Sequence, residues 1–231
     1  MKPPGPLLAS GRDSDIFEYG PGLILRRSRQ GRSMAAEARV MEYARQHGYP
    51  VPAVDELSGD GRDMIMERID GLDMVGAIQR RPWQIPALGR SLAGLHRRLH
   101  EIPAPDWVPA APVGAGDSLL HLDLHPLNVM LSATGPVVID WSGACRGDPS
   151  TDVAVAWVLM EAGEVQTGPV LGLIAQRARA VLVRNFLRGV DGPAARRALR
   201  QVVAWKVNDP HMSAGEQARM WRVVDEEEQA P

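Results

Sequence analysis

Short runs of alternating apolar and polar residues fill the first third of the chain. DIFEY and LILRR flank a GPG turn, and AVDEL and RDMIMERI flank SGDG, so each set is typical of two antiparallel strands joined by a tight turn. Between them, MAAEARVMEYARQHGYP has apolar residues at 34, 38 and 41 and ends in Gly48 and Pro50, which predicts a helix. We expect the order strand, strand, helix, strand, strand from residue 7 to about 70.

Helical spacing replaces the alternation after the Asp-Gly turn at residues 70 and 71. Leucines at 88, 92, 95 and 99 share one helical face, and residues 101–118 are rich in proline and glycine, which favours a loop. SLLHLDLHPLNVML and GPVVIDW then give two short apolar stretches with a turn between them. Further helical patterns follow at 152–162, 168–189 and 193–207, and a capping box at Ser213 and Glu216 predicts a last helix.

These patterns predict an α+β fold with two lobes. The first is a small antiparallel-sheet lobe over residues 1–70, and the second is a larger, mainly helical lobe over residues 72–231. We expect a cleft between the lobes, with a hinge at about residues 66–71.

Composition excludes several classes of partner. The formal net charge of −2 gives no reason to expect nucleic acid or an anionic membrane surface. The longest apolar run, VAVAWVLM at 153–160, is far below the roughly 20 residues of a membrane span. Cys145 is the only cysteine, which excludes an internal disulfide, and MKPPGPLLAS lacks the apolar core of a signal peptide, so we expect a cytoplasmic protein.

The stretch HLDLHPLNVM at 121–130 carries the candidate chemistry. Asn128 lies five residues after Asp123, and Asp140 in VVIDW lies seventeen residues after Asp123. An amide oxygen and a carboxylate suit Mg²⁺, which would leave Asp123 uncoordinated. Phosphoryl transfer needs this division, because metal ions neutralise charge on the phosphates while a separate carboxylate takes the proton of the acceptor hydroxyl.

In these residues the chain resembles the aminoglycoside phosphotransferase and choline kinase group of the protein-kinase-like fold. HLDLHPLNVM is similar to that group's HxDxHxxN loop, and VVIDW is similar to its metal-binding segment. The resemblance implies a phosphotransferase that uses ATP or GTP and a small-molecule acceptor with a hydroxyl group. It also implies that Asp123 is the base, that Asn128 and Asp140 hold Mg²⁺ and that His121 orients the loop.

The same resemblance assigns nucleotide contacts to the small lobe. It implies that Arg26 contacts the phosphates and pairs with Glu37, although Arg27 next to it leaves the register uncertain by one residue. In MERIDG, Met66 would be the gatekeeper, with the Glu67 carbonyl and the Ile69 amide facing adenine. The phosphate loop SGRDSDIF at 10–17 has one glycine, so Ser10 and Ser14 would supply hydroxyl contacts.

Two other functions remain open from the sequence. HLDLH is also consistent with a metal-dependent hydrolase, because residues 121, 123 and 125 would share one face of a strand. The glycine-poor phosphate loop is consistent with a nucleotide-binding module that lacks activity. We do not expect His96 and His100 to bind a metal, although they lie four residues apart. No third ligand accompanies them, and we expect them on a solvated basic helix.

The acceptor is constrained only by charge. Residues 161–209 contain eight Arg or Lys and four Asp or Glu, so we predict that a polycationic aminoglycoside is not the best substrate.

Overall fold

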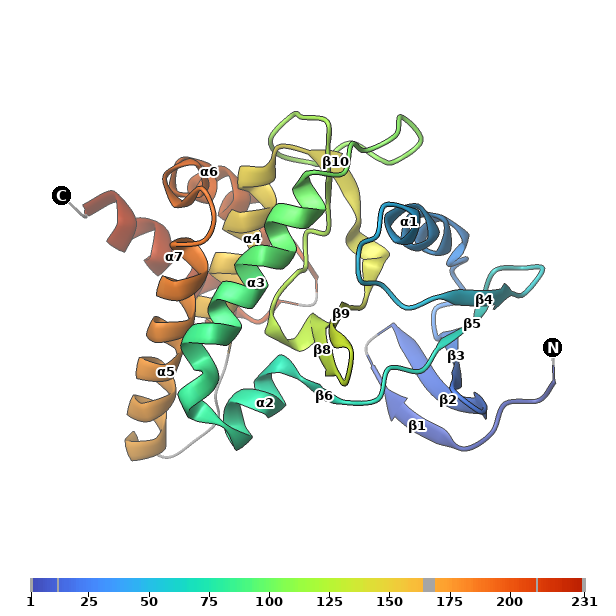
Figure 1. The fold of residues 1–231 in the computed structure, drawn as a ribbon. Coiled ribbons are helices and arrows are strands. Elements are labelled where there is room, and N and C mark those ends of the chain that lie inside the picture. Colours follow the sequence, from blue (N-terminus) through green and yellow to red (C-terminus); the bar gives the residue numbers. More distant parts are fainter. Residues whose placement is uncertain (1, 12, 164–168, 211, 230–231) are drawn as a thin grey trace. The chain divides into compact units, whose positions relative to one another are not determined.

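The protein is represented by a computed structural model that describes residues 2–11, 13–163, 169–210 and 212–229 (Figure 1). The chain divides into two compact units, and the α+β class expected from the sequence is confirmed. The first unit contains Met1–Leu72 and Val129–Ser142, and the second contains Asp73–Asn128 and Gly143–Pro231. The sequence pattern had grouped 129–142 with the helical lobe, but the Val138 amide donates to the Pro50 carbonyl (2.8 Å) in the first unit.

A five-stranded antiparallel sheet forms most of the first unit. Its strands lie in the order β1-β2-β3-β5-β4. The four predicted strands are present, whereas β1 was missed because all its residues are exposed and no buried face alternates along it. The bounds are β1 Leu7–Ser10, β2 Ser14–Gly20, β3 Leu23–Ser28, β4 Val54–Leu57 and β5 Asp63–Glu67.

Helix α1 (Ala35–Gln46) confirms the predicted helix. Met34, just before the helix, and Met41 are buried as the apolar pattern indicated, and the buried residues of the helix also include Glu37, Val40 and Ala44. A charged residue therefore lies on the buried face of the helix. Burial of a carboxylate costs free energy unless it is paired, so Glu37 needs a cationic partner.

The hairpin of β8 (Val129–Ser132) and β9 (Gly135–Val138) completes the first unit. It joins β6 (Leu72–Asp73) in a sheet of order β6-β8-β9. Gly71, with φ of +156°, allows this approach, because a Cβ there would collide with the Leu131 carbonyl oxygen. The hairpin thus leads directly into Asp140.

Helices form most of the second unit. They are α2 (Met74–Arg80), α3 (Ile85–His100), α4 (Pro149–Ala162), α5 (Pro169–Leu187), α6 (Gly192–Lys206) and α7 (Ala214–Gln229). The predicted leucine face of α3 is confirmed, since Leu88, Leu92, Leu95 and Leu99 are all buried. Helix α3 runs beside α5, and α4 packs against α6 and α7 (Figure 1). Helix α4 is apolar on nearly all sides, as expected for a helix inside a bundle.

Local signals at helix ends explain several boundaries. The Ser213 amide donates to Glu216 (2.8 Å) and the Glu216 amide donates to the Ser213 hydroxyl (3.1 Å), which confirms the capping box. Asp148 caps α4 by accepting from the Ser150 amide (2.7 Å). The sequence did not reveal α2 or the short antiparallel strands β7 (Ser118–Leu120) and β10 (Cys145–Gly147). Within the described part of the chain, no helix is long and apolar enough to cross a membrane.

Candidate active site

The loop between β7 and β8 brings Asp123 and Asn128 into direct contact. The Asn128 side-chain amide donates to the Asp123 backbone carbonyl (2.8 Å) and to Asp123 Oδ2 (2.8 Å). A 3-10 turn over Pro126–Asn128 places the amide, and the Asn128 backbone N–H donates to the His125 carbonyl (2.9 Å). Among the described residues none donates to Asn128 Oδ1, so this oxygen remains an acceptor.

Asp123 is ionised at neutral pH. Burial opposes its charge, but the hydrogen bond from His125 and the charges of His125, Lys206 and His121 hold its pKa below the usual value. His125 Nε2 lies 3.7 Å from Asp123 Oδ1, and 36% of the Asp123 side chain is exposed. A charged, partly exposed carboxylate fixed from one side can accept a proton from an incoming hydroxyl.

The backbone on either side of Asp123 is anchored by buried side chains. The Leu122 amide donates to Asp152 Oδ1 (2.7 Å), and Leu122 has a φ of +57°, a conformation that favours glycine. His96 Nε2 donates to the Leu124 carbonyl (3.0 Å). Since residues 122 and 124 are both held, the strained backbone conformation is maintained and the direction of the Asp123 side chain is restricted.

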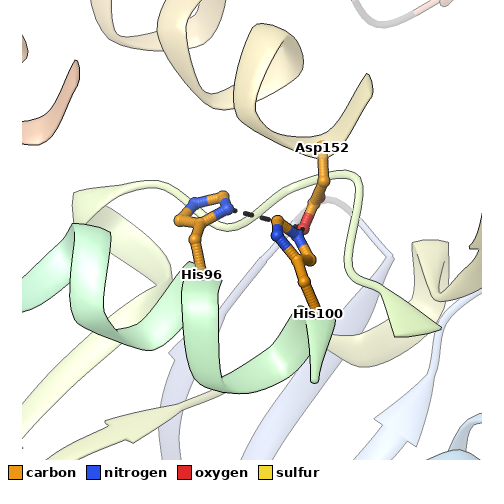
Figure 2. Close-up of side chains that lie close together, drawn as sticks. All are labelled: His96, His100 and Asp152. Atoms are coloured by element: carbon orange, nitrogen blue, oxygen red, sulfur yellow. Dashed lines mark hydrogen bonds and ion pairs between the residues drawn. The ribbon is translucent and has the colours of Figure 1, made fainter. Parts of the chain in front are cut away.

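His96, His100 and Asp152 form a buried cluster in the second unit (Figure 2). Figure 2 shows both imidazoles on α3, directed toward Asp152 in the first turn of α4. His100 Nε2 lies 2.9 Å from Asp152 Oδ2, and His96 Nδ1 lies 3.5 Å from the same oxygen. The expectation of a solvated basic face at His96 and His100 is wrong, because the leucine face of α3 carries both histidines into the interior.

Asp152 is charged despite complete burial. Desolvation favours its neutral form, but His100, which donates to Oδ2, and the adjacent imidazole of His96 hold its pKa well below the usual value. Nearby Cys145 is an unreactive thiol, because burial, followed by the charge of Asp152, raises its pKa to about 12.

The HLDLH segment does not assemble a transition-metal triad. In the described ranges, the group of three His, Cys, Asp or Glu side chains whose ligand atoms converge is His96, His100 and Asp152. His121 is fully buried, whereas the Asp123 and His125 side chains are 36% and 19% exposed. The chain bends at Leu122, so the strand geometry that would align residues 121, 123 and 125 is absent from this stretch.

The first unit joins Arg26, Glu37 and Asp140. Arg26 donates to Glu37 Oε1 (2.5 Å), to Asp140 Oδ1 (3.2 Å) and to the Ser14 hydroxyl (3.0 Å). Arg27 points to the opposite face of β3, where it pairs with Asp63 (2.6 Å). Strand alternation therefore places Arg26, not Arg27, next to α1.

Glu37 is the centre of this network. Burial raises its pKa, opposed by the charge of Arg26, and its Oε1 also accepts from the Trp141 amide (3.1 Å). Burial opposes the charge of Arg26, yet Glu37 and Asp140 raise its pKa, so the guanidinium stays protonated. One glutamate thus links β3 to the segment that carries Asp140.

Asp140 has a left-handed backbone conformation, which is uncommon for residues other than glycine. Its φ is +62°, and its Oδ1 accepts from Arg26 and from the Ser142 hydroxyl (3.0 Å). No described residue donates to Oδ2, and 43% of the side chain is exposed. An oxygen of this kind is a ligand that suits Mg²⁺.

The remaining predicted nucleotide contacts lie in the first unit. The Ser10 hydroxyl donates to Asp15 (2.6 Å), and the Ser14 hydroxyl is occupied by Arg26. Met66 is buried near the end of β5, and the Glu67 amide donates to the Ala53 carbonyl (2.8 Å). Ile69 follows in the irregular segment before β6.

Solved structures with the same fold are enzymes that phosphorylate small molecules. ADP-bound aminoglycoside phosphotransferase APH(2'')-Ib is 16% identical, with a TM-score of 0.62 over 96% of this chain and 91% of that chain. Aminoglycoside phosphotransferase APH(4)-Ia is 17% identical, with a TM-score of 0.63 and coverages of 95% and 92%. A choline/ethanolamine kinase family protein from Mesorhizobium loti is 16% identical, with a TM-score of 0.62 and coverages of 98% and 89%. The expected protein-kinase-like fold is confirmed.

Sequence comparison identifies the family. No curated protein matches the chain. The family model described as the phosphotransferase enzyme family matches residues 6–115 and 105–199. Since these matches span well over half of the chain, the protein belongs to the phosphotransferase enzyme family, as the resemblance in HLDLHPLNVM and VVIDW implied.

Proposed function

We propose that the protein transfers the γ-phosphate of ATP to a hydroxyl group of a small molecule. Asp123 would act as the base, and Asn128 and Asp140 would hold Mg²⁺. The observation that carries the proposal is the pair of hydrogen bonds from the Asn128 amide to Asp123, which fix the base and leave Asn128 Oδ1 for the metal.

The two oxygens of Asp123 would have different roles. Oδ2 is held by Asn128, so Oδ1 would receive the proton of the acceptor hydroxyl. The lowered pKa keeps the Asp123 carboxylate ionised, so that it can accept a proton, but it also makes the carboxylate a weaker base. Bound Mg²⁺ would supply charge neutralisation on the phosphates.

Nucleotide binding is assigned to residues 1–70, with the hinge at 66–71, and acceptor binding to residues 72–231. Arg26 would contact the phosphates, because Glu37 and Ser14 fix the position of its guanidinium. Ser10 and Ser14 would line the phosphate loop, although their present partners would have to give up hydrogen bonds. Met66, the Glu67 carbonyl and the Ile69 amide would receive the adenine.

The similarity to nucleotide complexes supports ATP as the donor. A streptomycin-ATP-APH(2")-IIa ternary complex is 18% identical, with a TM-score of 0.61 over 92% of this chain and 89% of that chain. GTP remains the alternative donor, and a direct comparison of the two nucleotides decides between them.

The acceptor would be a small alcohol other than a multiply charged aminoglycoside. Part of the excess positive charge in residues 161–209 is neutralised by acidic residues outside this range. Arg196 and Arg200 form ion pairs with Glu227 and Glu228 of α7. Lys206 pairs with Asp209 (3.2 Å), but its side chain is only 13% exposed, and its charge also contributes to lowering the pKa of Asp123. A cation within electrostatic range of the base would disfavour a polycationic acceptor.

The test measures Mg²⁺-dependent phosphate transfer from ATP and from GTP to a panel of hydroxyl-bearing metabolites and antibiotics. Wild-type protein is expected to phosphorylate at least one alcohol, and Asp123→Asn is expected to bind ATP but transfer phosphate about 10²- to 10⁴-fold more slowly. Nucleotide binding with no transfer to any acceptor would instead support a nucleotide-binding module. No nucleotide binding would reject the proposal.

A further inference from the structure

We propose that His96, His100 and Asp152 form a transition-metal site, separate from the magnesium donors, that fixes the loop carrying Asp123. The ligand atoms would be His96 Nδ1, His100 Nε2 and Asp152 Oδ2, which all lie within 4.8 Å of one another. The preferred ion would be Zn²⁺ or an ion of similar ligand preference, such as Co²⁺.

The protonation of His96 creates the need for a cation. Its Nε2 faces the Leu124 carbonyl, which can only accept, so Nε2 carries the proton and Nδ1 of the neutral ring carries a lone pair. Nδ1 is buried and has no hydrogen-bond partner among the described residues. Instead it is directed at the Asp152 carboxylate, 3.5 Å away and likewise fully buried. A lone pair facing a carboxylate in the interior is repulsive unless a positive charge lies between them.

The distances favour a metal ion over a proton in that position. A proton on Nδ1 would form only a poor hydrogen bond across 3.5 Å. A tetrahedral Zn²⁺ with bonds of about 2.0–2.1 Å places its ligand atoms about 3.3 Å apart. The separations from Asp152 Oδ2 to His96 Nδ1 and His100 Nε2, 3.5 Å and 2.9 Å, bracket this value.

The surrounding contacts resemble those that orient ligands at metal sites. His96 Nε2 is bound to a backbone carbonyl, and Asp152 Oδ1 is bound to the Leu122 amide, so the outer atoms of these two ligands are already fixed. Two imidazoles make the site unsuited to Mg²⁺, which prefers oxygen ligands. His100 is the least buried member, with 10% of its side chain exposed, and gives the ion a route of entry.

Metal binding would require a change of tautomer in His100. In the metal-free state the ring donates from Nε2 to Asp152 Oδ2. On binding, a neutral ring would move its single proton from Nε2 to Nδ1 by exchange with solvent, so that Nε2 presents a lone pair and three new bonds form to the ion. His96 already has the required tautomer and releases no proton.

The predicted consequence is a more rigid catalytic loop. Asp152 and His96 hold the backbone at Leu122 and Leu124, the two neighbours of Asp123. An ion that ties these two side chains together would couple both anchors. Loading the site should therefore raise the melting temperature of the protein and protect the amides of this loop from hydrogen exchange.

The experiment uses untagged, chelator-treated protein and Co²⁺ as the probe. Titration of the wild type should give the visible absorption of tetrahedral Co²⁺ at one equivalent, and Zn²⁺ in excess should abolish it while Mg²⁺ does not. His96→Gln and His100→Gln each remove a proposed ligand and should weaken Co²⁺ binding at least about tenfold. Tenfold is the lower end of the loss expected when only an outer contact of a ligand is removed. The matched control is His47→Gln, since His47 is an exposed histidine at the end of α1.

Two results would overturn the site. One is a wild-type protein that takes up no Co²⁺ or Zn²⁺, which would mean that the cluster holds only protons. The other is equal binding in His96→Gln and wild type, with circular dichroism showing both folded. Because metal content and absorption are measured without substrate, either result leaves the proposed phosphotransferase activity untouched.

Discussion

The side-chain amide of Asn128 contacts Asp123 twice, at the backbone carbonyl and at the carboxylate, each at 2.8 Å. One side chain therefore sets both the position of the loop backbone and the rotamer of the proposed base. The remaining atom of the amide, Oδ1, is the atom proposed to bind the metal. Positioning and metal binding are thus joined in a single residue.

Replacing Asp123 tests the base. Asp123→Asn is expected to lower kcat for phosphate transfer by about 10²- to 10⁴-fold, because proton removal from the acceptor loses its catalyst. The KM for ATP should change little, since the base does not contact the donor in this mechanism. Steady-state kinetics with the best acceptor checks both values, and transfer at the wild-type rate would contradict the assignment.

Replacing Asn128 tests the double role of its amide. Asn128→Ala removes the donor to Asp123 and the proposed magnesium ligand, so both kcat and the Mg²⁺ requirement should worsen. Asn128→Asp keeps a metal-binding oxygen but places a second carboxylate against Asp123, so it should retain Mg²⁺ affinity and lose kcat. Mg²⁺ titrations of activity separate the two variants, and identical profiles would argue against metal binding at this position.

Replacing Arg26 tests the buried network of the first unit. Arg26→Met leaves Glu37 buried without its cation, which should lower the free energy of unfolding by about 3–5 kcal/mol. The double variant Arg26→Met with Glu37→Gln should recover part of this loss, because no buried charge remains and an acceptor for the Trp141 amide is kept. Urea denaturation checks these values. Arg27→Met is the surface control, since Arg27 is 43% exposed.

The depressed pKa of Asp152 predicts how stability depends on pH. Its carboxyl group has a lower pKa in the folded protein than the model value of 3.8, so the folded state binds fewer protons than the unfolded state at acidic pH. The contribution of Asp152 should be complete above about pH 5, begin to fall as the pH drops below 3.8, and be lost only as the pH falls through the lowered pKa of the folded state. The difference in unfolding free energy between wild type and Asp152→Asn should shrink over this range, measured in chelator; a constant difference would contradict the assignment.

Replacing Lys206 tests the charge near the base. Lys206→Met should increase the relative kcat/KM for cationic acceptors over neutral ones, because a repulsive charge is removed. Arg200→Met is the matched control, since Arg200 lies on the same helix and is likewise paired with an acidic residue, Glu228 of α7. Equal acceptor preferences in wild type and Lys206→Met would place Lys206 outside the acceptor site.

Local patterns predicted the fold well where burial alternates regularly. The strands DIFEY and LILRR, the leucine face of α3 and the Ser213 capping box were all read correctly, because each depends on neighbours in sequence. In α1 the pattern predicted the burial of Met34 and Met41 but not that of Glu37, since an apolar pattern does not reveal that a carboxylate is buried by an arginine from β3. Tertiary pairing added a buried charge that the local pattern does not show.

The candidate site was predictable only in part for the same reason. The spacing of Asp123, Asn128 and Asp140 identified the family, and strand alternation was needed to distinguish Arg26 from Arg27. The histidines at 96 and 100 seemed to lack a third ligand because Asp152 lies 52 residues beyond His100. A signal was present, since a polar pair four residues apart on the leucine face of a helix indicates burial, but its partner is fixed by helix packing.

The assignment of residues 129–142 to the first unit has a consequence for how the protein is made. The chain must leave the first unit near residue 72, build 56 residues of the second, and return before the first is complete. A ribosome that has released only the first 72 residues has produced the five-stranded sheet without the β8–β9 hairpin that completes the unit. Fragments cut at that position should therefore be insoluble or unfolded, and neither unit can be made as one contiguous fragment of this chain.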